Sequence, residues 1–84
     1  MRTVYRYPLA LGAQTIELSH DAQPLFVGLR GNTPTLWAAL FTDDPVVARR
    51  FMVAETGTEI PAFALYVGTY QQGSKAFHVF EVPA

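Results

Sequence analysis

Arginine and tyrosine side chains carry the chemistry in this 84-residue chain that best suits ligand binding. A tyrosine ring can stack on a flat base, and an arginine can bind a phosphate through two parallel hydrogen bonds. Both residue types occur near the N-terminus, whereas further arginines lie in the middle of the chain and two further tyrosines lie toward the C-terminus. We therefore predict a ligand-binding set that consists of Tyr5, Arg6, Tyr7, Arg49, Arg50, Tyr66 and Tyr70.

The same residue types also suit a structural role. Phenylalanines and Trp37 would then form the core, tyrosines would lie at its margins, and one arginine would cover apolar surface with its stem. Adjacent strand residues point to opposite faces, so only one of Arg49 and Arg50 can serve a given pocket. The other would reach a pocket of a neighbouring subunit. A buried Trp37 ring would be worth about 3–5 kcal/mol, whereas an exposed ring would be a candidate for binding.

The two histidines show no spacing typical of catalysis or metal binding. His20 and Asp21 are neighbours in a polar loop, and His78 lies in a strand pattern near the C-terminus. The chain has no cysteine, and its glycines form no phosphate-binding loop. We expect a solvated His20, a packed or hydrogen-bonded His78, no catalytic residue, no metal and no cofactor. A small hydrolase that depends on His78 ranks third among the functions considered.

Charge is scarce, because 50% of the residues are hydrophobic and 15% are charged, with a formal net charge of −1. Average chains carry about 25% charged residues. The near-neutral balance predicts no general affinity for nucleic acid, although a few arginines could still form a local site. The apolar excess predicts covered sheet faces or association of chains, so we expect a homo-oligomer. We expect no membrane span, and no signal peptide because Arg6 and Pro8 interrupt the N-terminal segment.

Short alternating segments predict strands as the elements that position these side chains. The longest apolar stretch, 25–41, is predicted to be a hairpin with its turn at Gly31 and Asn32, and with Pro34 in a wider loop or at the start of the return strand. A loop or 3₁₀ turn is expected over 42–48. The other predicted strands cover 2–7, 14–18, 49–55, 63–70 and 76–82. The pattern predicts a single all-β domain over 1–84, a small antiparallel β-sandwich or partly open barrel of about six to seven strands.

Several short segments resemble an uncharacterised family of small phage-encoded proteins. They are spread over nearly the whole chain, so the resemblance is to a whole domain. The segments are VYRYPL at 4–9, TIEL at 15–18, LWA at 36–38, RRF at 49–51, TG at 56–57, IP at 60–61, YVGT at 66–69 and FHVFE at 77–81. The resemblance implies a phage or prophage origin and expression inside a bacterium. It assigns no activity and no functional residue.

The favoured function from the sequence is therefore a non-enzymatic phage accessory protein that self-associates and binds a small anionic ligand or a host or phage protein. Within that class, we favour an anti-defence protein that sequesters a nucleotide-derived immune signal in the cytoplasm of the infected host. The alternative is a structural or decoration protein of the virion, in the capsid or tail. Both assignments rest on analogy with small phage proteins.

Overall fold

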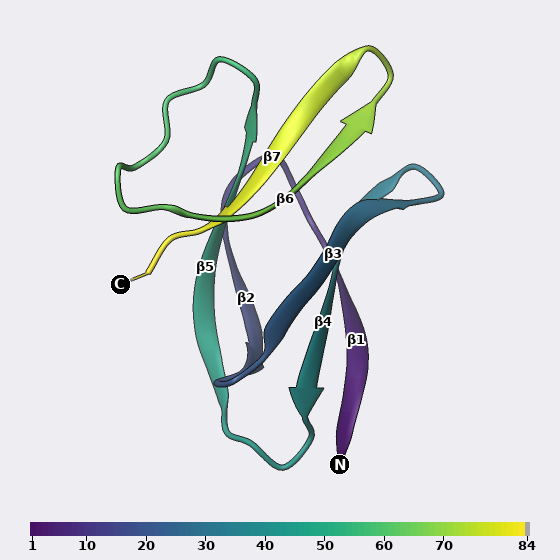
Figure 1. The fold of residues 1–84 in the computed structure, drawn as a ribbon, viewed down its shortest axis with the longest axis vertical. Coiled ribbons are helices and arrows are strands. Elements are labelled where there is room, and N and C mark those ends of the chain that lie inside the picture. The colour runs from purple at the N-terminus through teal and green to yellow at the C-terminus, as the bar shows by residue number, and fades with distance from the viewer. Residues whose placement is uncertain (84) are drawn as a thin grey trace.

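The computed structural model describes residues 1–83, and within them it contains seven strands and no helix (Figure 1). Alternating apolar and polar residues form most of these strands, as the sequence predicts. The strands are β1 (Arg2–Pro8), β2 (Gly12–Ser19), β3 (Gln23–Arg30), β4 (Thr33–Phe41), β5 (Val46–Glu55), β6 (Leu65–Gln72) and β7 (Lys75–Glu81).

The strands form two antiparallel sheets. Sheet A has the order β1-β4-β3, and sheet B has the order β2-β5-β7-β6. The two sheets pack face to face as a small sandwich without closing into a barrel, and β3 of sheet A lies beside β6 of sheet B along one side (Figure 1). The all-β prediction is confirmed. The predicted central hairpin is also present, and β4 is the middle strand of sheet A.

Two tight turns fix the register of the hairpins. Gly31 and Gly73 each have a φ near +60° at the first of two turn residues, the conformation that a type II′ turn requires. Pro34 is tolerated at the second position of β4. Its carbonyl accepts a hydrogen bond from the Leu9 N–H at 2.8 Å, so its nitrogen points to the side on which β1 has already ended.

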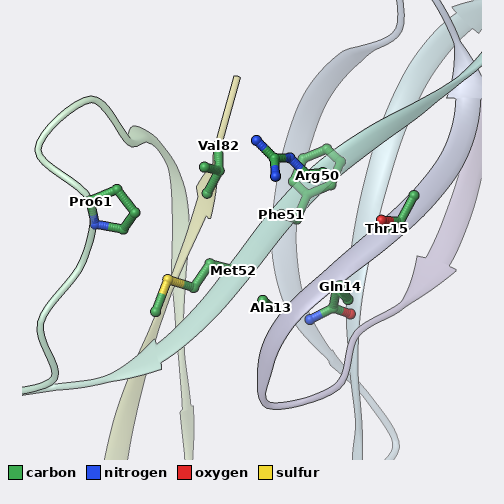
Figure 2. A pocket seen from close by; sticks show the side chains of 8 residues that line it. All are labelled: Ala13, Gln14, Thr15, Arg50, Phe51, Met52, Pro61 and Val82. Carbon is green, nitrogen blue, oxygen red and sulfur yellow. The ribbon is translucent and has the colours of Figure 1, made fainter. Parts of the chain in front are cut away.

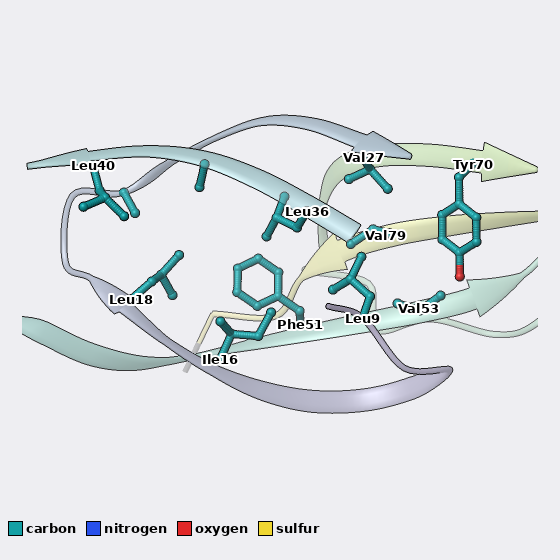
Figure 3. Close-up of a cluster of buried hydrophobic side chains, with 12 residues drawn as sticks. Leu9, Ile16, Leu18, Val27, Leu36, Leu40, Phe51, Val53, Tyr70 and Val79 are labelled. Atoms are coloured by element: carbon teal, nitrogen blue, oxygen red, sulfur yellow. The ribbon is translucent and has the colours of Figure 1, made fainter. Parts of the chain in front are cut away.

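The core lies between the inner faces of the two sheets (Figure 3). Leu36 of sheet A and Val53 of sheet B both point into the core, and Phe51 fills its centre with 1% of its surface exposed. Phe51 is the one phenylalanine that is fully buried. The expectation of a phenylalanine core is therefore wrong for Phe26 and Phe63, which are 62% and 60% exposed.

Two β-bulges change which residues share a face. One lies between Pro24 and Phe26, and it leaves Leu25 half exposed. The other lies between Tyr66 and Gly68. Because a bulge inserts an extra residue, it shifts the alternation of the strand by one position. Strict alternation therefore assigns Leu25 of β3 wrongly, and on β6 it wrongly puts Tyr66 on the face of Gly68 and Tyr70.

Strand boundaries also differ from the prediction in several places. β2 includes Ser19, which was expected in a loop, and β5 begins at Val46 directly after a short turn rather than at residue 49. Residues 63 and 64, predicted to start a strand, belong instead to the loop 56–64 between β5 and β6. Edge residues with mixed polarity give a weak periodic signal, so the ends of strands are hard to predict.

Candidate functional site

The predicted ligand-binding residues do not converge on one pocket. Tyr5 and Tyr7 line a groove of about 210 Å³ at the open side of the sandwich, together with Glu17 of β2 and Val46 of β5. Burial raises the pKa of Tyr7, and Tyr5 beside it raises that pKa further, so the phenol stays neutral at physiological pH. No arginine lines this groove, and the Glu17 carboxylate would repel an anionic ligand.

Arg49 is committed to the fold. It points into the sandwich because it is the register partner of Ile16, and its Nε and Nη2 atoms each donate to the Glu81 carboxylate at 2.7 Å. Nη1 donates to the Ala22 carbonyl at 2.8 Å, and the guanidinium lies 5.9 Å from the centre of the Phe51 ring. The hydrogen bonds to Glu81 raise the pKa of Arg49. All three nitrogens therefore have partners within the chain.

Arg50 points the opposite way, to the outer face of sheet B. It borders a cavity of about 270 Å³ that Pro61 of the loop 56–64 also lines (Figure 2). Met52 and Val82 form the apolar part of the lining, and Thr15 lies near the arginine. This cavity offers one positive charge, but its one aromatic residue, Phe51, has almost no exposed surface. It therefore lacks a flat ring on which a base could stack.

Tyr66 and Tyr70 lie on opposite faces of sheet B because of the bulge at residue 67. Tyr66 is 65% exposed and packs edge-on against Phe80 at 5.9 Å, whereas Tyr70 is 7% exposed and stacks on Phe77 at 5.3 Å in the interior. Burial raises the pKa of Tyr70. Tyr70 is thus a core residue, and Tyr66 remains accessible.

His78 lies on the outer face of sheet B in a chain of hydrogen bonds. Its Nδ1 is 3.0 Å from the Thr69 hydroxyl and its Nε2 is 2.8 Å from the Thr56 hydroxyl, while Tyr66 bonds to Thr69 at 2.8 Å. The prediction of a hydrogen-bonded strand histidine is confirmed. His20 is exposed and contacts the neighbouring Asp21 at 2.9 Å.

Arg6 belongs to a site that was not identified from the sequence. On the outer face of sheet A, Arg6 from β1 and Arg30 from β3 line one hollow of about 150 Å³. Its other lining residues are Pro8, Thr33 and Thr35, and the Thr35 hydroxyl donates to the Thr33 carbonyl at 2.9 Å. Two guanidinium groups that approach from both sides of β4 form a setting suited to a phosphate or another small anion.

Two aromatic rings lie next to this hollow on the same face. Trp37 is the register partner of both Arg6 and Phe26, and the Phe26 and Trp37 rings are 5.7 Å apart. Gly28 makes room for this arrangement, because a Cβ atom at that position would come within 2.6 Å of the Phe26 ring. Trp37 is half-buried rather than part of the core, so it becomes a candidate for binding.

Charge separates sharply between the two sheets. The described strands of sheet A contain three arginines and none of the seven acidic residues of the chain, which all lie in sheet B or in loops. The three arginines, Arg2, Arg6 and Arg30, all belong to the outer face of sheet A through their register partners. Asp43, in the loop after β4, lies 3.8 Å from the N-terminal amino group. The near-neutral net charge therefore conceals a local basic surface.

We call this surface the outer face of sheet A. Its aromatic and aliphatic members are Val4, Phe26, Trp37 and Phe41, and its cations are Arg2, Arg6 and Arg30. Gly28 is the one feature of the sequence that could have indicated this surface, because a small residue beside Phe26 on the same strand face leaves room for a large ring. Neighbouring strands bring the remaining members together, and their pairing is not visible in the local sequence.

Neither a metal site nor a helical membrane span is present in residues 1–83. No group of three or more His, Cys, Asp or Glu side chains is placed to hold an ion. The described chain also has no helix with the length and hydropathy to cross a bilayer.

Comparison with known proteins gives one match. Residues 1–84 match the family model described as "Domain of unknown function (DUF7352)". No curated protein and no solved structure matches the chain. Because the family model covers the whole chain, the protein belongs to this family.

Proposed function

We propose that this member of the family is a non-enzymatic binding protein of phage origin that captures an anionic, ring-bearing ligand on the outer face of sheet A. The observation that carries the proposal is the hollow lined by both Arg6 and Arg30 beside the Phe26–Trp37 pair. A nucleotide-derived ligand requires a positive charge for its phosphate and a flat surface for its base. This face offers both, with no carboxylate in its strands.

The biological setting is part of the same proposal. The resemblance of the sequence to small phage-encoded proteins suggests that the protein acts in the cytoplasm of an infected bacterium, where it sequesters a nucleotide-derived immune signal. Capture needs no reaction, and the described chain contains no set of nucleophile, base and orienting group around His78, whose two ring nitrogens contact threonine hydroxyls.

Self-association belongs to the proposal through a different surface. Ile60, Phe63, Leu65 and Tyr66 are exposed and close in sequence, on the β5–β6 loop and the start of β6. Exposed apolar surface typically marks an interface, and here it lies on both faces of β6, because Leu65 pairs with the inward-facing Glu81 and Tyr66 pairs with Phe80 on the outer face. Pairing through the outer face of sheet A would instead bring six arginines of two copies together without a carboxylate to balance them. Light scattering should show a mass above one chain, and Leu65→Ser should lower it.

Calorimetry with cyclic nucleotides and ADP-ribose tests the binding function. Binding of at least one of these compounds, with the compound recovered unaltered, is the expected result. Arg6→Gln and Arg30→Gln should each weaken binding by roughly tenfold, since each loses a charged hydrogen bond. Arg50→Gln is the matched control, because Arg50 is an exposed arginine on the other sheet, and it should bind like the parent.

A decoration protein of the virion is the second candidate function. The exposed apolar residues of the β5–β6 loop and β6 favour it, because they could bind a capsid or tail protein instead of another copy. Absence of heat with every nucleotide, together with recovery of the protein in purified phage particles, would replace the first proposal with this one.

A further inference from the structure

We propose that the outer face of sheet A can bind a single strand of nucleic acid that lies along β4, so that a free nucleotide occupies only part of this surface. This inference rests on the proposed function and specifies its ligand class. It is carried by the distribution of rings and cations along the face, which extends well beyond the hollow between Arg6 and Arg30.

The face contains two separate places where a ring and an arginine occur together. At one end, the Arg2 guanidinium lies 6.0 Å from the centre of the Phe41 ring. Nearer the other end, Phe26 and Trp37 lie beside Arg6. Phe41 and Trp37 are four residues apart on β4, which corresponds to roughly 13 Å at about 3.3 Å per residue. The rings are therefore too far apart to contact the same base.

The cations extend along the same line. The register pairs Arg2 with Phe41 and Arg30 with Thr33, at the two ends of β4. Eight residue steps along β4 separate these positions, or roughly 26 Å. A chain of phosphates fits a row of cations of this length, and OB folds, which are small β domains of another topology, bind about 4–16 nucleotides of a single strand. A mononucleotide would leave Arg2 and Phe41 unused.

Charge and exposure favour this occupant over two others. A second copy of the chain would place like charges against each other, as argued above. An acidic protein segment would balance the arginines but would leave the exposed Phe26 ring, at 62% accessibility, without the flat partner that a base provides. With a net charge of −1, the electrostatic field of the rest of the protein attracts an anionic strand only weakly. We therefore expect the affinity for nucleic acid to depend strongly on these three arginines.

Fluorescence anisotropy with a labelled oligothymidylate of about eight nucleotides tests this inference. Thymidine monophosphate and polyglutamate serve as competitors. Phe41→Ala should weaken binding of the oligonucleotide by at least about fivefold, since it removes one stacking ring. The slope of log K against log salt should be near −2 for the parent, as expected for about three phosphate contacts to a single strand, and Arg2→Gln should make it shallower by about 0.7.

The variants distinguish this inference from the function on which it rests. Phe41→Ala and Arg2→Gln should leave binding of the nucleotides used for calorimetry unchanged, and Lys75→Gln, on sheet B, should change neither kind of binding. If the monophosphate competes as well as the oligonucleotide and Phe41→Ala has no effect, the inference is wrong and the proposed function stands. Equal competition by polyglutamate would identify an acidic protein as the occupant. If neither oligonucleotide nor nucleotide binds, both proposals fail.

Discussion

Arg49 and Arg50 are adjacent in the sequence and have different environments, because strand residues alternate between the two faces of a sheet. Arg49 faces the interior, where Glu81 and the carbonyl groups of the β2–β3 turn accept its hydrogen bonds. Arg50 faces outward and lines an apolar cavity. The sequence indicates that the two arginines must point in opposite directions. It does not indicate which one meets a carboxylate, because Glu81 lies more than thirty residues further along the chain.

Replacement of Arg49 by lysine should destabilise the protein. Lysine cannot form the two parallel bonds to Glu81, and the side chains of Arg49 and Glu81 are only 16% and 20% exposed. The free energy of unfolding should fall by about 1–3 kcal/mol, below the range for fully buried pairs because both groups keep some solvent contact. Urea denaturation measures this change, and Arg50→Lys is the control, expected to stay within about 0.5 kcal/mol of the parent.

The pH dependence of this contribution follows from the raised pKa of Arg49. A group whose pKa is higher in the folded than in the unfolded protein adds stability that is fully present below the unfolded-state pKa. That stability is lost only as the pH rises through the folded-state pKa. Even in the unfolded chain, an arginine loses its proton only at strongly alkaline pH. The Arg49 guanidinium should therefore stay charged from about pH 5 to about pH 9. Its ionisation should not change the free energy of unfolding over that range.

At the scale of strands, β3 and β6 determine how the two sheets meet. Each contains a bulge, and the two strands lie side by side at one edge of the sandwich. Gly68 allows this contact, because a Cβ atom at that position would lie 2.9 Å from Cβ of the buried Val27. A glycine within a strand often marks such a close approach.

Gly68→Ala should therefore destabilise the fold by about 1–3 kcal/mol, since Val27 is enclosed by the core and cannot move away. Gly28→Ala is the matched comparison, because its Cβ would meet the Phe26 ring, which is 62% exposed and can shift toward solvent. Thermal melting should show a clear decrease in Tm for Gly68→Ala and a small one for Gly28→Ala. Equal melting temperatures would mean that β3 and β6 do not pack as described.

The sequence predicts the seven strands and both hairpin turns because these features depend on local alternation and on glycine. It does not predict the bulges at Leu25 and Val67, which shift the later residues of a strand to the other face. For that reason Tyr66 and Tyr70, which strict alternation would put on one face, lie on opposite faces. The outer face of sheet A was missed for a related reason. Its arginines lie on two different strands and meet only across β4.

At the scale of the whole molecule, the two sheets differ in charge more than the composition suggests. Half of the six basic residues lie on the outer face of sheet A, and the seven acidic residues lie elsewhere. Such a separation orients a charged partner before contact and restricts binding to one side. It also explains how a chain with a net charge of −1 could bind an anion.

Trp37 makes it possible to test this account with a single measurement. It is the only tryptophan of the chain, and it lies on the outer face of sheet A, 5.7 Å from Phe26. The indole can be excited selectively. Its fluorescence should be quenched in a saturable way during titration with the oligothymidylate, because a base stacks beside the indole. The quenching should disappear in the Arg6→Gln, Arg30→Gln double variant and persist in Arg50→Gln. Unchanged emission while calorimetry records binding of the same oligonucleotide would place the ligand on another surface and contradict the account.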